Sequence, residues 1–176
     1  MNRNPMTSTA VQEKPISPED ALQEAKPLFV DCLRLIERMH RRMLDVIKVE
    51  LDQNGVVDIN SVQALLLYNV GEQEVTAGEL RSRGYYMGSN VSYNLKKLVE
   101  TGYIEHERAK HDRRAVRVRL SEKGQQISRL LEQAFEGQTI EALNAQAINT
   151  EGLSSAIRAL KNLERFWSEK IRFVEF

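Results

Sequence analysis

The sequence predicts a mainly helical protein with one small β-hairpin in its second half. Three observations lead to this fold class. Apolar residues recur at spacings of three and four over most of the chain, which indicates amphipathic helices. The period changes to two only between residues 104 and 120, which indicates two short strands. The 176 residues, 41% of them hydrophobic, are enough for one domain with its own core.

The first 16 residues differ in composition from the helix that follows them. Residues 1–16 contain two prolines and no apolar periodicity, so we expect a disordered arm. Ser17 is the expected N-cap of a long helix that reaches about Gly55, with Pro18 at its first position. Pro27 marks either a kink in this helix or its true start. The apolar stripe of the helix comprises Leu28, Phe29, Cys32, Leu35, Ile36, Met39, Met43, Val46 and Ile47.

Three shorter helices are expected between residues 59 and 101. The segment from Ile59 to Val70 is very apolar and predicts a buried helix. Thr76 and Glu79 have the spacing of a capping box, so a short helix should begin just after Thr76. The third helix, at about residues 89–101, has an apolar face of Val91, Leu95, Leu98 and Val99. Its opposite face carries Ser89, Asn90, Tyr93, Lys96 and Lys97.

A hairpin is predicted at about residues 104–120, with a charged turn between its strands. If the strands pair about Asp112, Arg117 and Arg119 face Glu107 and Glu105, and cross-strand ion pairs are their expected role. Two helices complete the chain. Ser121 should cap the first, and the second should run from about Thr150 to Phe173.

Charge is unevenly distributed along a chain whose formal net charge is zero. Between Thr76 and Lys123 there are 11 Lys and Arg against 6 Asp and Glu, whereas the remainder has 14 against 19. A basic middle segment on an acidic body is typical of a localised contact with a polyanion.

Two short helices followed by a hairpin describe a winged helix-turn-helix, whose second helix enters the major groove of DNA. We therefore expect a recognition helix at about residues 89–101 and a wing at about residues 104–120. The candidate DNA contacts are Ser89, Asn90, Tyr93 and Asn94 at base edges, Arg81, Lys96 and Lys97 at phosphates, and Lys110, Arg113 and Arg114 at the minor groove. The alternative is a winged-helix module that uses the same face for a protein partner and does not bind DNA.

The two ends of the chain have more apolar helical surface than a small winged-helix lobe needs. The last helix has a seam of Leu153, Ile157, Leu160, Trp167, Ile171 and Val174. We expect one domain over residues 17–176, in which residues 56–124 form the lobe and residues 17–55 and 125–176 are dimerisation helices. A two-fold homodimer would bind a palindromic operator. The alternative is that these helices pack only within one chain.

Several classes of protein and site are not expected. Cys32 is the one cysteine, so an intrachain disulfide is excluded and a reducing compartment is indicated. We find no signal peptide and no stretch long and apolar enough for a membrane span, so a cytoplasmic protein is expected. His40, His106 and His111 lack the spacing of metal ligands, and the sequence has no phosphate loop or nucleophile motif. We predict no metal, no cofactor and no enzymatic activity.

The segments "VTAGELRSRG" and "GSNVSYNLKKLVETGYIEHERAKHDRRAVRVRLSEKG" resemble those of the MarR-type winged-helix transcription regulators of bacteria. The resemblance implies that Asp112 and Arg114 brace the wing, although Ala115 stands where the family often has serine. It also implies a small aromatic or phenolic ligand that weakens DNA binding, for which Cys32 and Met39 are candidate contacts. The segment "RGYYMGSNVSYNLKKLVE" is further similar to the LdtR-type branch of alphaproteobacteria, which implies control of cell-envelope or stress genes.

Overall fold

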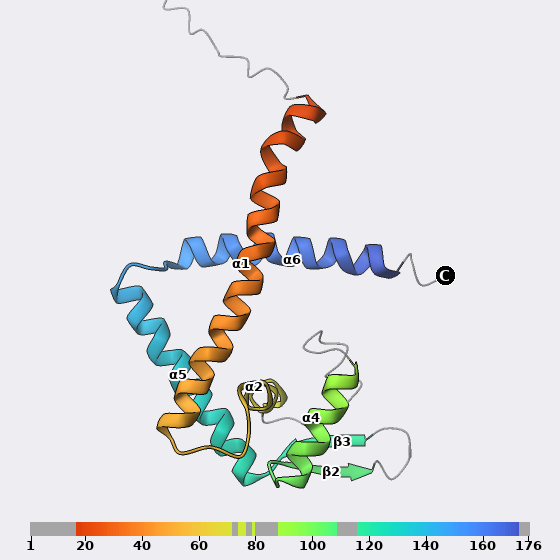
Figure 1. Cartoon of the computed structure of the whole chain (residues 1–176), viewed down its shortest axis with the longest axis vertical. Coiled ribbons are helices and arrows are strands. Elements are labelled where there is room, and N and C mark those ends of the chain that lie inside the picture. Colours follow the sequence, from red (N-terminus) through yellow and green to blue (C-terminus); the bar gives the residue numbers. More distant parts are fainter. Residues whose placement is uncertain (1–16, 72–73, 77–78, 80–87, 109–115, 173–176) are drawn as a thin grey trace, which may run out of the picture. The chain divides into compact units, whose positions relative to one another are not determined.

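The computed structural model describes residues 17–71, 74–76, 79, 88–108 and 116–172, with only the backbone described at 88–91, 106–108 and 116 (Figure 1). The predicted arm, residues 1–16, lies outside the described residues. The chain divides into two compact units, Met1–Leu44 and Asp45–Phe176. The boundary between them falls inside the first helix, and each unit is described by itself below.

The helix α1 spans Pro18–Gln53 and begins where the sequence predicts. Its N-terminus is capped by Ser17, whose hydroxyl oxygen accepts a hydrogen bond of 3.1 Å from the backbone N–H of Asp20. Pro27 lies inside the helix and does not mark its start. In the first unit the apolar stripe of α1 is exposed or half-buried, whereas Ile47 and Leu51 are fully buried in the second unit.

The core of the second unit lies where α2 (Ser61–Val70) packs against α5 (Glu122–Asn144). Its largest fully buried side chains are Ile47, Leu51, Leu66, Leu67, Val75, Leu98, Tyr103 and Leu131. Asn60 and Gln63 form a capping box at the start of α2, which the sequence analysis did not predict. The predicted cap of α5 is confirmed, because the Ser121 hydroxyl accepts a 3.1 Å hydrogen bond from the Gly124 N–H.

The sheet is antiparallel and three-stranded, in the order β1-β3-β2. Its strands are β1 (Val75–Thr76), β2 (Ile104–Arg108) and β3 (Val116–Leu120). Glu105 lies opposite Arg119 and Glu107 opposite Arg117, so the predicted pairing about Asp112 is confirmed. The strand β1 was not predicted, because two residues are too short to show a period of two.

Two further helices complete the described elements, α4 (Gly88–Glu100) and α6 (Thr150–Arg172). Asn149 caps α6 by accepting a 2.7 Å hydrogen bond from the Gly152 N–H, and no residue of α6 is buried. Among the described helices, none combines the length and apolar character needed to span a bilayer. The predicted fold class, mainly helical with a small β-hairpin, is confirmed.

Candidate nucleic-acid interface

The helix α4 is the predicted recognition helix, and its C-terminal end is closed by a Schellman motif. Gly102 has a φ of +77°, the left-handed conformation that ends many helices. Its N–H donates to the Val99 carbonyl at 3.1 Å, and the Tyr103 N–H donates to the Leu98 carbonyl at 2.8 Å. Because both bonds return to the last turn of α4, the backbone of Tyr103 is fixed to the helix.

The two faces of α4 differ in burial as the sequence predicts. Leu98 is fully buried and Leu95 is buried beside it, so this side fastens the helix to the lobe. Tyr93 is 69% exposed on the other side, where Lys96 and Lys97 are also exposed. Asn94 is half-buried, and the side chains of Ser89 and Asn90 lie outside the described residues. An aromatic ring and two ammonium groups therefore occur together on a face that the core does not use, and Asn94 lies at the edge of that face.

Glu100 is the acidic neighbour of both lysines of α4. Its carboxylate oxygens lie 3.9 Å from Lys96 Nζ and 4.0 Å from Lys97 Nζ. Exposed pairs at such distances contribute little free energy, so the lysines remain available to an external anion.

A capping box and two ion pairs hold the segments around the sheet. The predicted capping box is confirmed, because the Glu79 N–H donates to Thr76 Oγ1 at 3.0 Å and the Thr76 N–H donates to Glu79 Oε2 at 2.5 Å. Arg119 forms the predicted cross-strand ion pair with Glu105 at 2.7 Å. Arg117 pairs with Glu74 at 3.3 Å, which joins the segment before β1 to the wing. The predicted contacts Arg81, Lys110, Arg113 and Arg114, and the bracing residue Asp112, lie outside the described residues.

A cluster of three polar residues, Asp58, Tyr103 and Lys123, lies at the C-terminal end of α4. The Tyr103 hydroxyl donates to Asp58 Oδ1 at 2.6 Å, and Lys123 Nζ donates to Asp58 Oδ2 at 2.7 Å. Lys123 Nζ also lies 4.0 Å from the centroid of the Tyr103 ring. Sequence reasoning missed this cluster, because its members are separated by tens of residues and none belongs to a local pattern.

The ionisation of the cluster follows its hydrogen bonds. The hydrogen bond from Lys123, and next the one from Tyr103, holds the pKa of the Asp58 carboxyl below its ordinary value. Asp58 in turn raises the pKa of the Lys123 ammonium group. Burial, and then the hydrogen bond to Asp58, raises the pKa of the Tyr103 phenol. At neutral pH the cluster therefore contains a carboxylate, an ammonium group and a neutral phenol.

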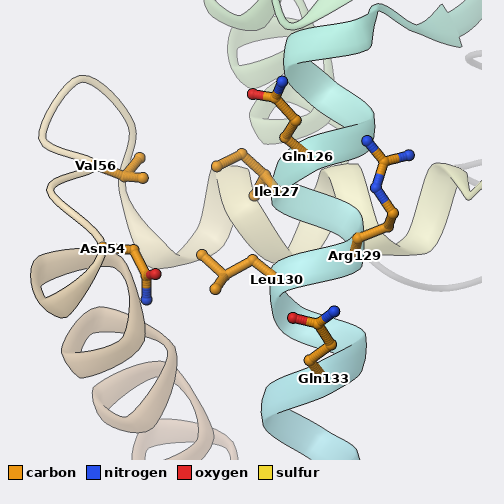
Figure 2. A pocket seen from close by; sticks show the side chains of 7 residues that line it. All are labelled: Asn54, Val56, Gln126, Ile127, Arg129, Leu130 and Gln133. Atoms are coloured by element: carbon orange, nitrogen blue, oxygen red, sulfur yellow. The ribbon is translucent and has the colours of Figure 1, made fainter.

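A cavity of about 360 Å³ lies between the segment after α1 and the first half of α5 (Figure 2). It is lined by Asn54, Val56, Gln126, Ile127, Arg129, Leu130 and Gln133. The predicted ligand contacts Cys32 and Met39 do not line it: Cys32 is half-buried and Met39 is exposed, both in the first unit. Within the described part of the chain, no group of three His, Cys, Asp or Glu side chains is placed to hold a metal ion.

Comparison with known proteins gives the family. Residues 59–124 match the family model described as "Winged helix DNA-binding domain". The chain is 39% identical over 145 residues, 82% of this chain and 74% of the relative, to the exopolysaccharide II synthesis transcriptional activator ExpG of Rhizobium meliloti (strain 1021). The chain belongs to the MarR family of winged helix-turn-helix transcription regulators. This membership places it among regulators and not among enzymes.

Solved structures of MarR-family regulators share the fold of the chain. The structure of Streptococcus pneumoniae FabT in complex with DNA has a TM-score of 0.61 and 23% identity, covering 80% of this chain and 98% of FabT. A putative MarR-family regulator from Listeria monocytogenes, complexed with 26mer DNA, has a TM-score of 0.68 and 19% identity, covering 81% of this chain and 93% of that chain. At these identities the likeness concerns the fold alone.

Proposed function

We propose that this MarR-family protein is a homodimeric, sequence-specific DNA-binding regulator of the bacterial cytoplasm. The helix α4 lies in the major groove and the wing lies at the minor groove. The observation that carries this proposal is the exposure of Tyr93 on the face of α4 opposite Leu95 and Leu98. An exposed tyrosine flanked by lysines suits a groove that offers thymine methyl groups and phosphate oxygens.

The residues divide between reading bases and holding the DNA backbone. Hydroxyl and amide groups make hydrogen bonds to base edges, which we assign to Ser89, Asn90, Tyr93 and Asn94. Lys96, Lys97 and Arg81 neutralise phosphates, and Lys110, Arg113 and Arg114 of the wing contact the minor groove. Asp112 braces the wing through Arg114. The DNA complexes of FabT and of the Listeria regulator support a nucleic acid as the partner of this fold.

The apolar faces of the terminal helices support the proposed homodimer. Every large apolar side chain of the predicted α6 seam is exposed within the described residues, namely Leu153, Ile157, Leu160, Trp167 and Ile171. The stripe of α1 is similarly exposed at Leu28, Phe29, Leu35, Ile36 and Met39. A helix without a buried residue gains little from tertiary packing, so a second copy that covers these faces would stabilise it.

Regulation is assigned to a small aromatic ligand that weakens DNA binding, with Cys32 and Met39 as its candidate contacts. The genes under control are assigned to the cell envelope or to stress responses, which is also the expectation for the LdtR-type branch. The relative ExpG, a transcriptional activator of exopolysaccharide II synthesis, supports an envelope target. Selection of genomic fragments bound by the protein tests this assignment, and fragments without envelope or stress promoters would contradict it.

Selection of bound duplexes from a random DNA pool tests the central proposal. A palindromic consensus is expected, because a two-fold dimer presents two α4 helices to two half-sites. Salt-insensitive binding to a protein, without affinity for DNA at low salt, would instead support the alternative of a protein-interaction module.

Two substitutions on α4 distinguish phosphate contacts from base contacts. Lys97→Ala should weaken binding to all duplexes and reduce the slope of log affinity against log salt by about one. Asn90→Ala should relax the preference at one base pair and leave that slope unchanged. Equal losses with unchanged salt dependence for both variants would contradict these roles.

Sedimentation of an α6 variant tests the dimer. Ile157→Glu introduces a charge into the exposed seam and should shift the protein from dimer to monomer. Glu151→Gln, at the start of the same helix and outside the seam, is the matched control and should leave the dimer intact. A monomeric wild-type protein at concentrations that saturate its operator would contradict the proposal.

A further inference from the structure

We infer that Asp58 is a positioning residue for DNA binding: through the Tyr103 hydroxyl and the Lys123 ammonium group, it sets the angle at which α4 leaves the lobe. This inference rests on the proposed function of α4 as the recognition helix. Asp58 lies in the segment between α1 and α2 and is not one of the residues proposed to contact DNA.

Tyr103 moves with α4. Its backbone N–H is bonded to the Leu98 carbonyl at 2.8 Å, and its side chain is only 2% exposed. A buried ring has one available orientation, so the hydroxyl occupies a fixed position relative to the last turn of the helix. Any group that holds this hydroxyl also holds the C-terminal end of α4.

Three separate segments meet at the Asp58 carboxylate. One carboxylate oxygen of Asp58 accepts a hydrogen bond of 2.6 Å from the Tyr103 hydroxyl. The other accepts a hydrogen bond of 2.7 Å from Lys123 Nζ. Lys123 Nζ lies 3.3 Å from the Thr101 carbonyl as well, directly after α4. The carboxylate therefore joins the segment before α2, the end of α4 and the first turn of α5.

Ser121, the cap of α5, holds the backbone that follows α4. The Ser121 hydroxyl donates to the Gly102 carbonyl at 2.7 Å, and the Ser121 N–H donates to the Tyr103 carbonyl at 3.0 Å. These bonds fix where the end of α4 lies. The side-chain bonds of Asp58 add a second point of attachment, and two points are needed to fix a direction.

The direction matters because two of the reading residues, Ser89 and Asn90, lie at the far end of the helix. The 13 residues of α4 place its N-terminal end about 18 Å from Glu100, so a tilt of about 5° moves that end by about 1.5 Å. Hydrogen bonds to base edges do not survive such a displacement. Lysine side chains are long and flexible, so phosphate contacts adapt to it. Loss of Asp58 should therefore reduce selective binding and spare non-specific binding.

The experiment compares Asp58→Asn and Tyr103→Phe with Asp52→Asn as the matched control. Asp52 pairs with Lys48 on the exposed surface of α1, so its replacement changes the charge identically without affecting α4. Affinity is measured for a duplex selected with the wild-type protein and for a random-sequence duplex. Circular dichroism and thermal unfolding of each variant show that measurements are made on folded protein.

Asp58→Asn should lower affinity for the selected duplex about tenfold and Tyr103→Phe about fivefold, as expected when hydrogen bonds that orient the helix are lost. Affinity for the random duplex and the salt slope should stay within about twofold of wild type, as should all values for Asp52→Asn. The double variant should resemble Asp58→Asn, because both changes remove one shared attachment.

Two results would overturn the inference. Parallel losses for the selected and random duplexes would mean that Asp58 only stabilises the fold, and unchanged selectivity of Asp58→Asn would mean that it does not orient α4. In either result the wild-type protein still binds the selected duplex more tightly than the random one. Failure of the proposed function differs, because the wild-type protein itself would then select no duplex.

Discussion

Lys96 Nζ lies 3.9 Å from a carboxylate oxygen of Glu100, one turn further along the exposed face of α4. The same carboxylate lies 4.0 Å from Lys97 Nζ, so one acid lies beside both lysines of α4 that are proposed to contact phosphates. A phosphate and Glu100 therefore compete for the same ammonium groups.

Neutralising this acid should strengthen non-specific DNA binding. Glu100→Gln is expected to raise affinity for a random-sequence duplex about threefold at low salt, with a smaller gain as salt screens the charges. Fluorescence anisotropy across a salt series measures both effects. The control is Glu136→Gln, which removes an exposed carboxylate from α5. An equal gain in both variants would indicate a general charge effect and contradict a local role for Glu100.

The two faces of α4 should separate stability from binding. Tyr93→Ala removes a side chain that is 69% exposed, so the free energy of unfolding should change by less than about 0.5 kcal/mol while affinity for the selected duplex falls. Leu98→Ala removes a fully buried side chain and should lower that free energy by about 2–5 kcal/mol. Urea unfolding measures the stability of the two variants, and a binding assay measures their affinity for the selected duplex. A strongly destabilised Tyr93→Ala variant would show that Tyr93 belongs to the core.

Two glycines of α5 should respond oppositely to alanine. A Cβ at Gly124 would clash with the Tyr103 carbonyl oxygen, so Gly124→Ala must displace the backbone at the end of α4 and should destabilise the protein by about 1–3 kcal/mol. A Cβ at Gly137 would meet nothing within 4 Å, so Gly137→Ala should stabilise it by about 0.5–1 kcal/mol. Thermal unfolding measures the loss of stability in the first variant and the gain in the second. A tolerated Gly124→Ala would mean that α5 and Tyr103 can separate without cost.

Acid should remove the contribution of Asp58 to stability. Its pKa in the folded state lies below the ordinary value of 3.8, so folding favours the carboxylate. The stabilisation is therefore present above the pKa of the unfolded chain and is lost as pH falls through the lower folded value. Urea midpoints of the wild-type protein and Asp58→Asn should differ at neutral pH and converge only when the pH falls below the folded pKa, which is itself below 3.8.

A second background checks the origin of this pH dependence. When Tyr103→Phe is already present, the further substitution Asp58→Asn should change the urea midpoint less, because one of the two hydrogen bonds that lower the pKa of Asp58 is gone. A difference that persists undiminished into acid would contradict a stabilising role for the ionised carboxyl group.

The sequence by itself determined the longer helices, the two strands of the hairpin and three of the caps. The caps Ser17, Thr76 and Ser121 join residues three positions apart, so the residue types identify them. The two faces of α4 follow from a period of 3.6, and the register of the hairpin follows from the alternation of its strands about a charged turn. Local geometry leaves few alternatives at these positions.

Only the tertiary structure decided which distant segments meet. The pairing of β1 with β3, the ion pair of Arg117 with Glu74, and the attachment of Asp58 to Tyr103 and Lys123 join residues 43 to 65 positions apart, or strands too short to show a period. The apolar core fixes these partners, because burial of Tyr103 and Leu98 sets where the end of α4 lies and therefore which polar groups reach it. No spacing along the chain encodes that convergence.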